Sequence, residues 1–192
     1  FATEDSSIMR ALPNISILSP CDPWEADLLL KQTNSIEGPK YLRIDKTSAN
    51  SKIGELQFGI PRKCSEGKDA IIFATGGIVK EALKVAEELK ALNIGIQVYS
   101  VHTIKPLNLD FIKDDIKDIA NIFTLEEHTI NGGLGSAISE IILEYCKKIK
   151  VFKRFGINDQ FPSIVGDQNY LKRFHKLDSI SISKEIVNMI KK

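Results

Sequence analysis

Residues 102–107 read HTIKPL, and residues 125–136 read LEEHTINGGLGS. The second segment continues an apolar run at residues 119–125 that predicts a buried strand, and its glycines precede an apolar-periodic stretch at residues 136–149 that predicts a helix. A strand, a glycine-rich turn and a helix in this order form the repeating unit of an α/β fold. This segment decides the fold class, and the flanking sequence extends the same pattern.

The alternation of strands and helices continues through the second half of the chain. Strands are predicted at residues 70–74, 94–101, 119–125 and 151–155, and helices at residues 78–89, 109–116, 136–149 and 183–192. Such alternation predicts a mostly parallel sheet with helices on both faces, which is a three-layer α/β/α domain. Right-handed crossovers bring the carboxyl ends of the strands to one edge, where open sheets usually bind ligands.

The first fifty residues predict the tail of a second α/β domain. Its expected elements are helices at residues 4–12 and 24–32 and buried strands at residues 15–18 and 40–44. Asp22 and Pro23 supply an N-cap and a first-turn proline for the second helix. Residues 46–68 show little periodicity apart from a short strand expected at 56–60. The expected division is a first domain at residues 1–50, a linker at 51–68 and a C-terminal domain at 69–192.

Composition and charge narrow the classes of partner. The chain has 26 basic and 25 acidic residues, which are interspersed, so we expect neither nucleic acid nor a membrane as a partner. Cys21, Cys64 and Cys146 are odd in number and include no C-x-x-C pair, so neither a disulfide framework nor a zinc site is favoured. No apolar run approaches the roughly 18 residues of a membrane span, and no signal peptide is evident. A cytoplasmic location is expected.

Several segments together resemble the transketolase family. Besides residues 102–107 and 125–136, they are TED at 3–5, MRALPN at 9–14, SPCDP at 19–23, GPKYLR at 38–43 and, more thinly, GINDQF at 156–161. Their order and spacing carry the resemblance, which covers residues 3–136 most clearly. It implies that residues 1–50 end a domain that binds the pyrimidine of thiamine diphosphate, and that residues 69–192 form the transketolase C-terminal domain.

The resemblance implies transfer of a two-carbon ketol unit from a ketose phosphate to an aldose phosphate. In the family, the groups that bind thiamine diphosphate and magnesium lie upstream of the part matched here. We therefore expect no catalytic, cofactor-binding or metal-binding residue in this chain, no cofactor bound to it, and no activity of the chain alone. The expected partners are sugar phosphates, upstream thiamine-binding domains or a separate N-terminal subunit, and a second copy in a homodimer. Because the chain begins at Phe1 rather than Met, it is interpreted as a piece of a longer protein.

Arg43, Glu4 and Asp5 are the candidate substrate-binding residues. Arg43 follows a Gly-Pro turn and an extended segment, and a guanidinium can grip a phosphate with two parallel hydrogen bonds. The resemblance implies that this arginine contacts the phosphate of the sugar; the alternative is an ordinary ion pair. Glu4 and Asp5 match the active-site loop of the family and are expected near the substrate channel, although a first-turn acid also stabilises a helix.

Two further features have competing interpretations. The turn from Gly132 to Ser136 presents backbone N–H groups that could bind a phosphate, but it lacks the P-loop lysine and the G-x-G-x-x-G spacing, so a tightly packed turn is favoured. Glu126, Glu127 and His128 could perform acid/base chemistry or bind a metal, yet alternate side chains on a strand face opposite ways, so at most two converge. The resemblance favours a structural or subunit-contact role for them. His102 and His175 are expected to be packed or solvated.

Alternative functions remain at this point. The β subunit of 2-oxo acid dehydrogenases and deoxyxylulose-phosphate synthase share this type of C-terminal domain. The sequence also departs from the family: FPSIVG at residues 161–166 replaces a Gly-Glu-Ser-Gly-like loop, and HKLD at 175–178 replaces Tyr-Gly-Leu-Asp, which leaves the sugar open. A third alternative is a non-catalytic assembly or regulatory module that uses the α/β edge to bind an anion or to dimerise.

Overall fold

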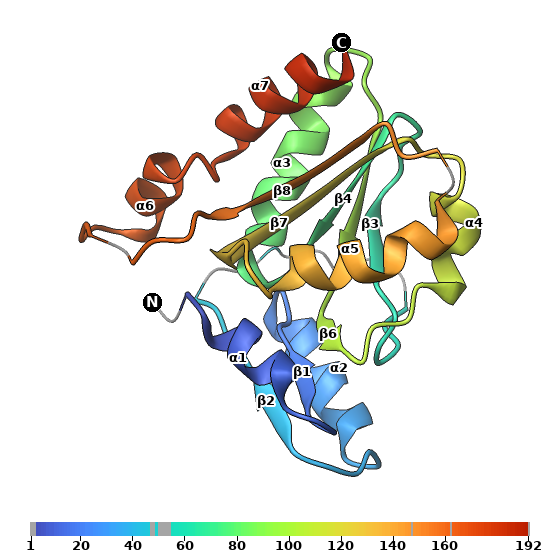
Figure 1. Cartoon of the computed structure of the whole chain (residues 1–192), viewed down its shortest axis with the longest axis vertical. Coiled ribbons are helices and arrows are strands. Elements are labelled where there is room, and N and C mark those ends of the chain that lie inside the picture. The colour runs from blue at the N-terminus through green and yellow to red at the C-terminus, as the bar shows by residue number, and fades with distance from the viewer. Residues whose placement is uncertain (1–2, 47–48, 50–54, 147, 162, 192) are drawn as a thin grey trace.

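A five-stranded sheet forms the centre of the molecule in the computed structural model, which describes residues 3–46, 49, 55–146, 148–161 and 163–191 (Figure 1). Its strands, in spatial order, are β3 (Arg62–Ser65), β5 (Ile96–Ser100), β4 (Ala70–Ala74), β7 (Asn121–Thr129) and β8 (Val151–Ile157). Four of them are parallel neighbours, and only β3, at one edge, is antiparallel. The predicted mostly parallel sheet is therefore confirmed.

Helices cover both faces of this sheet, which confirms the three-layer arrangement (Figure 1). On one face lie α3 (Val79–Lys90) and α7 (Ser179–Ile190), and on the other η2 (Asp110–Ile112), α4 (Lys113–Ile116) and α5 (Leu134–Tyr145). Strand β4 is buried throughout because its side chains alternate between the two layers: Ile72 packs toward α3 and α7, whereas Ile71 and Phe73 pack toward α4 and α5. This is why β4 reads as a continuous apolar run.

The N-terminal elements form a smaller layer below the main sheet (Figure 1). They are α1 (Asp5–Ala11), β1 (Ser16–Leu18), α2 (Pro23–Thr33) and β2 (Lys40–Leu42). Strand β1 pairs in parallel with β2 and antiparallel with β6 (Thr103–Lys105), a strand that directly follows β5. As predicted, Asp22 caps α2, accepting a hydrogen bond from the Glu25 N–H at 2.9 Å, and Pro23 occupies the first turn.

A buried ion pair fastens this smaller layer to the main sheet. The Glu25 side chain, on α2, is 0% exposed, and its Oε1 accepts from Nε and Nη2 of Arg62, on β3, at 2.9 and 2.8 Å. Its Oε2 accepts from the Cys21 N–H at 2.7 Å and the Ser100 hydroxyl at 3.1 Å. The guanidinium of Arg62 also lies 5.2 Å from the ring centroid of Trp24. One carboxylate thus joins three segments that are distant in sequence.

Some expected elements are corrected by the structure. The strand predicted at residues 56–60 is wrong, because that segment is a turn, and β3 instead falls within the stretch interpreted as a linker, where residues 47–48 and 50–54 lie outside the described part. Strand β2 is half exposed rather than buried. The helix α6 (Gln168–Phe174) was not predicted. The division at residues 51–68 stays a prediction. Within the described residues no helix could cross a membrane.

Strand β7 is longer than its apolar run predicts. The predicted strand ended at residue 125, but β7 continues through Glu126, Glu127 and His128 to Thr129, and these polar residues are buried. The sequence signal failed because it depends on apolar side chains, whereas here buried hydrogen bonds satisfy the polar groups. This extension of β7 places the side chains of Glu126, Glu127 and His128 at the end of the strand that faces the N-terminal layer.

Candidate functional site

The structure brings two of the three predicted substrate-binding residues together. Arg43, just after β2, donates from Nε to Asp5 Oδ2 at 3.1 Å and from Nη2 to the Glu127 carbonyl at 3.0 Å. Asp5 opens α1, and Glu127 belongs to the extended end of β7. The arginine side chain is 16% exposed and the aspartate side chain 11%. The site therefore forms where the N-terminal layer meets the sheet edge.

Tyr41 adds a second hydrogen bond to the same carboxylate. Its hydroxyl donates to Asp5 Oδ2 at 2.7 Å, and this hydrogen bond, with burial, raises the pKa of Tyr41. The three side chains line a cavity of about 580 Å³, whose wall also includes Asp45, Lys46 and Gln168. Since Asp5 holds one edge of the guanidinium and the Glu127 carbonyl another, Arg43 is fixed in one orientation at the cavity wall.

Glu4 lies apart from this pair. Its carboxylate accepts a hydrogen bond from the neighbouring Thr3 hydroxyl, and it lines a different cavity, of about 340 Å³, with Ser7 and Thr129. It occupies the N-cap position of α1 without making a side-chain capping hydrogen bond. The structure therefore joins Asp5, but not Glu4, to Arg43.

Glu126 belongs to β7, and its carboxylate lies at the N-terminus of α5. Its carboxylate accepts from the backbone N–H of Leu134 at 2.7 Å and of Gly135 at 2.8 Å, so these amides are engaged by a side chain of the same molecule. Burial raises the pKa of Glu126 to about 7, although the two amide hydrogen bonds oppose the shift. A Cβ on Gly133 would lie 2.1 Å from Glu126 Oε2, which explains the glycine. The geometry favours the tightly packed turn over phosphate binding.

His128 joins α1 to β7 beside Glu126. Its Nδ1 lies 2.8 Å from the Thr129 carbonyl and its Nε2 accepts the Ser7 N–H at 3.3 Å, an arrangement that assigns the proton to Nδ1 in a neutral ring. Burial lowers the pKa of His128. The ring lies 3.6 Å from Glu126 Oε2 and 3.8 Å from Asp5 Oδ1. Glu126 and His128 therefore converge on one face of β7, as the alternation predicts.

The Glu127 side chain lies on the opposite face of β7 from Glu126 and His128. It contacts Gln168 and Lys172, which were not among the site residues predicted from the sequence. The Gln168 amide donates to both of its carboxylate oxygens, at 3.2 and 3.0 Å, and also to Asp45 Oδ1 at 3.3 Å. The Lys172 ammonium lies 4.0 Å from Glu127 Oε1. Burial raises the pKa of Glu127 to about 7. The Asp167 N-cap of α6 was the one signal in the sequence that could have located Gln168.

The remaining histidines, His102 and His175, do not line the cavity at Arg43. His102 is fully buried, with Nδ1 2.9 Å from the Thr103 hydroxyl, and burial lowers its pKa to about 4. His175 is half buried and packs edge-on against Phe174, with ring centroids 5.1 Å apart. Among the described residues, no group of three or more His, Cys, Asp or Glu side chains could hold a metal ion.

Known proteins resemble this chain over nearly its whole length. A protein of Methanocaldococcus jannaschii named as a transketolase C-terminal section is 34% identical over 98% of the chain, which covers 60% of that protein. The 6-deoxy-6-sulfo-D-fructose transketolase subunit of Clostridium sp. strain MSTE9 is 35% identical over 96% of the chain, which covers 56% of that subunit. The chain thus spans little more than half of these relatives.

The fold also matches a solved structure. The protein described as "Split gene transketolase, inactive beta4 tetramer" superposes with a TM-score of 0.88 and 27% identity, over 99% of this chain and 62% of that one. The sequence profile of the family described as "Transketolase, C-terminal domain" matches residues 61–189. The chain therefore belongs to the transketolase family and carries its C-terminal domain.

Proposed function

We propose that this chain is the C-terminal portion of a thiamine-diphosphate-dependent transketolase, which transfers a two-carbon ketol unit from a ketose phosphate to an aldose phosphate. The observation that supports this proposal is the Arg43–Asp5 pair at the wall of an open cavity. A guanidinium held by a carboxylate and a carbonyl is pre-oriented, so a bound phosphate does not have to immobilise it. Family membership supplies the class of reaction.

Arg43 binds the substrate phosphate and Asp5 positions Arg43. Lys46 is an exposed second cation on the same cavity wall, which also carries the carboxylates of Asp5 and Asp45. Asp5 holds the arginine and also accepts from Tyr41, which leaves its carboxylate multiply anchored. Glu4, which lines the neighbouring cavity, is proposed to border the substrate channel rather than to contact the phosphate.

The cofactor belongs to another part of the enzyme. Thiamine diphosphate supplies the electron sink for ketol transfer and magnesium anchors its diphosphate. The described residues do not fit this group, since they contain no cluster of metal-binding side chains, and Glu126 fills the α5 N-terminus that could have received a diphosphate. We propose that the catalytic, cofactor-binding and metal-binding residues lie in that other part, and we expect the chain alone to be inactive.

The missing groups come from upstream thiamine-binding domains or a separate N-terminal subunit, in a cytoplasmic homodimer of the complete enzyme. The structural neighbour is the product of a split gene, and this supports a separate subunit. So do the names of the two curated relatives, one a transketolase C-terminal section and the other a transketolase subunit.

A reconstitution assay tests the proposal. The chain is combined with its N-terminal subunit or upstream domains, thiamine diphosphate and magnesium, and supplied with xylulose 5-phosphate and ribose 5-phosphate. Ketol transfer by the mixture, and none by either part, is expected. Turnover of pyruvate with glyceraldehyde 3-phosphate would instead identify a deoxyxylulose-phosphate synthase. Failure of the mixture to bind cofactor would favour a non-catalytic assembly module.

Arg43→Ala tests the phosphate role in that mixture. The KM for phosphorylated sugars should rise by about 10-fold or more, because a charge-assisted pair of hydrogen bonds is lost, while the KM for unphosphorylated sugars changes little. Arg173→Ala is the matched control, because Arg173 is exposed on α6. An equal rise for both classes of sugar would show that Arg43 does not bind the phosphate.

A further inference from the structure

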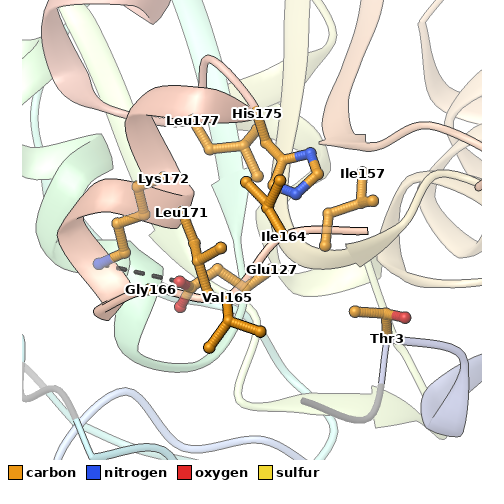
Figure 2. A pocket seen from close by; sticks show the side chains of 10 residues that line it. All are labelled: Thr3, Glu127, Ile157, Ile164, Val165, Gly166, Leu171, Lys172, His175 and Leu177. Carbon is orange, nitrogen blue, oxygen red and sulfur yellow. Dashed lines mark ion pairs between the residues drawn. The ribbon is translucent and has the colours of Figure 1, made fainter. Parts of the chain in front are cut away.

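A second cavity lies between the ends of β7 and β8 and helix α6. It has a volume of about 390 Å³, and its wall contains neither Arg43 nor Asp5 (Figure 2). Gly166 lines both cavities, so the segment before α6 separates this one from the proposed substrate site. The volume is in the range of natural small-molecule sites. Nothing in the proposed ketol transfer uses it.

Lys172 is the unusual residue of this cavity. It is only 4% exposed, and Figure 2 shows its ammonium directed toward the Glu127 carboxylate. The nearest carboxylate oxygens, on Glu81 and Glu127, are 3.9 and 4.0 Å away, which exceeds hydrogen-bond length. Within the described part of the chain the ammonium makes no hydrogen bond. The ammonium is ion-paired at long range but keeps its three N–H donors for an acceptor that enters the cavity.

The two neighbouring carboxylates are already engaged elsewhere. Glu81 pairs with Lys84 at 2.9 Å and accepts the Ser179 N–H at 3.2 Å. Both oxygens of Glu127 accept from Gln168. Neither carboxylate has an oxygen within hydrogen-bond distance of the Lys172 ammonium. The ammonium is therefore available to a ligand.

Most of the remaining wall is apolar. It is formed by Ile157, Ile164, Val165, Leu171 and Leu177. Two polar residues, Thr3 and His175, complete it, and Val165 is 99% exposed at the mouth. An apolar chamber with one cation that no carboxylate oxygen reaches at hydrogen-bond distance favours a molecule with a hydrophobic body and a single anionic head.

We propose that this cavity binds a small organic carboxylate, with its head on the Lys172 ammonium and its hydrocarbon body against Ile157 and Leu171. The carboxylate supplies the acceptor that Lys172 lacks, and the body removes apolar wall from water. The occupant would enter past Val165. This is a site separate from sugar phosphate binding, so it can be tested without the thiamine-binding partner.

The probe is 4-phenylbutanoate, with 4-phenylbutan-1-ol as a control that has the same body and no charge. Binding to the 192-residue chain is measured by calorimetry, and NMR of the Ile157 methyl groups locates it. The carboxylate should bind and the alcohol should bind about 10-fold more weakly or not at all, since only the carboxylate forms a charge-assisted hydrogen bond with Lys172. Equal binding of both probes would overturn the proposal.

Variants of the chain distinguish a loss of the ligand site from a loss of the fold. Lys172→Met should weaken carboxylate binding by about 10-fold or more, whereas Lys184→Met, at an exposed position on α7, should leave it unchanged. Val165→Trp narrows the exposed mouth without touching the core and should also weaken binding. Retained binding in both Lys172→Met and Val165→Trp, or no binding to the unmodified chain up to about 10 mM probe, would refute the site.

Discussion

Replacing Glu25 by Gln should destabilise the protein more than any change at an exposed ion pair. The Glu25 side chain is fully buried and receives four hydrogen bonds, two of them from Arg62. Gln keeps the shape but removes the charge, and its NH₂ group must face one of these donors. Arg62 is then left as a buried cation without a counter-charge from residue 25, and β3 loses its anchor on α2.

The expected magnitude follows from this burial. Breaking a buried ion pair from one side costs about 3–5 kcal/mol, and in a protein of this size about 1 kcal/mol corresponds to 2–4 °C, so Tm should fall by about 6–20 °C. Thermal unfolding followed by circular dichroism measures the shift. The loss should depend little on salt, because a buried pair is poorly screened.

Asp27→Asn provides the matched control. Asp27 lies on the same helix and pairs with Lys31 at 2.7 Å, but their side chains are 59% and 68% exposed. Such a pair contributes about 0.3–0.5 kcal/mol, so Tm should change by less than about 2 °C. Combining Glu25→Gln with Arg62→Met should cost less than the sum of the single changes, because the stranded charge is gone. A loss below about 1 kcal/mol in Glu25→Gln would refute the argument.

Three further predictions concern buried polar groups near the sheet. Gly133→Ala should cost about 2–4 kcal/mol in urea unfolding, because its Cβ displaces Glu126 from two backbone amides. The cost should be smaller in a Glu126→Ala background, where only the contact of the Cβ with His128 Nδ1, at 2.6 Å, remains; an equal cost in both would contradict this. Burial lowers the pKa of His102 to about 4, against about 6.5 in the unfolded chain, so its contribution to stability is complete above about pH 6.5. The free energy of unfolding should fall between about pH 6.5 and 4, by up to about 3 kcal/mol more than in His102→Gln; parallel pH profiles of the two proteins would contradict this prediction. His128→Ala should leave single-turnover chemistry of the assembled enzyme nearly unchanged, and a large loss with assembly intact would assign His128 to the reaction.

Local signals in the sequence determined most of the fold. The apolar run of β4 predicts a strand buried on both faces, and the spacing of Val79, Ala82, Val85 and Leu89 predicts α3, because these residues must be apolar for the layers to pack. The Asp22 cap fixed the start of α2. These elements were predictable because their stabilising contacts repeat at short, regular intervals along the chain.

Elements held by polar or isolated contacts were not predictable. Strand β3 is short and joins the sheet at its edge, and its key residue, Arg62, is buried only because Glu25 lies opposite. The polar half of β7 lacks an apolar pattern, so nothing in its sequence distinguishes it from a loop. Helix α6 is seven residues long and has only Lys172 among its buried residues.

The sequence by itself, through its resemblance to a family, singled out Arg43 and Asp5 but could not say that they touch. Their contact, and that of Glu127 with Gln168 and Lys172, joins segments separated by 38 to 45 residues along the chain. Only the tertiary structure decides such contacts, because hydrogen bonds and ion pairs require a fixed distance and direction between groups. Local patterns specify which surfaces are apolar, whereas the packing of the layers specifies which polar groups meet.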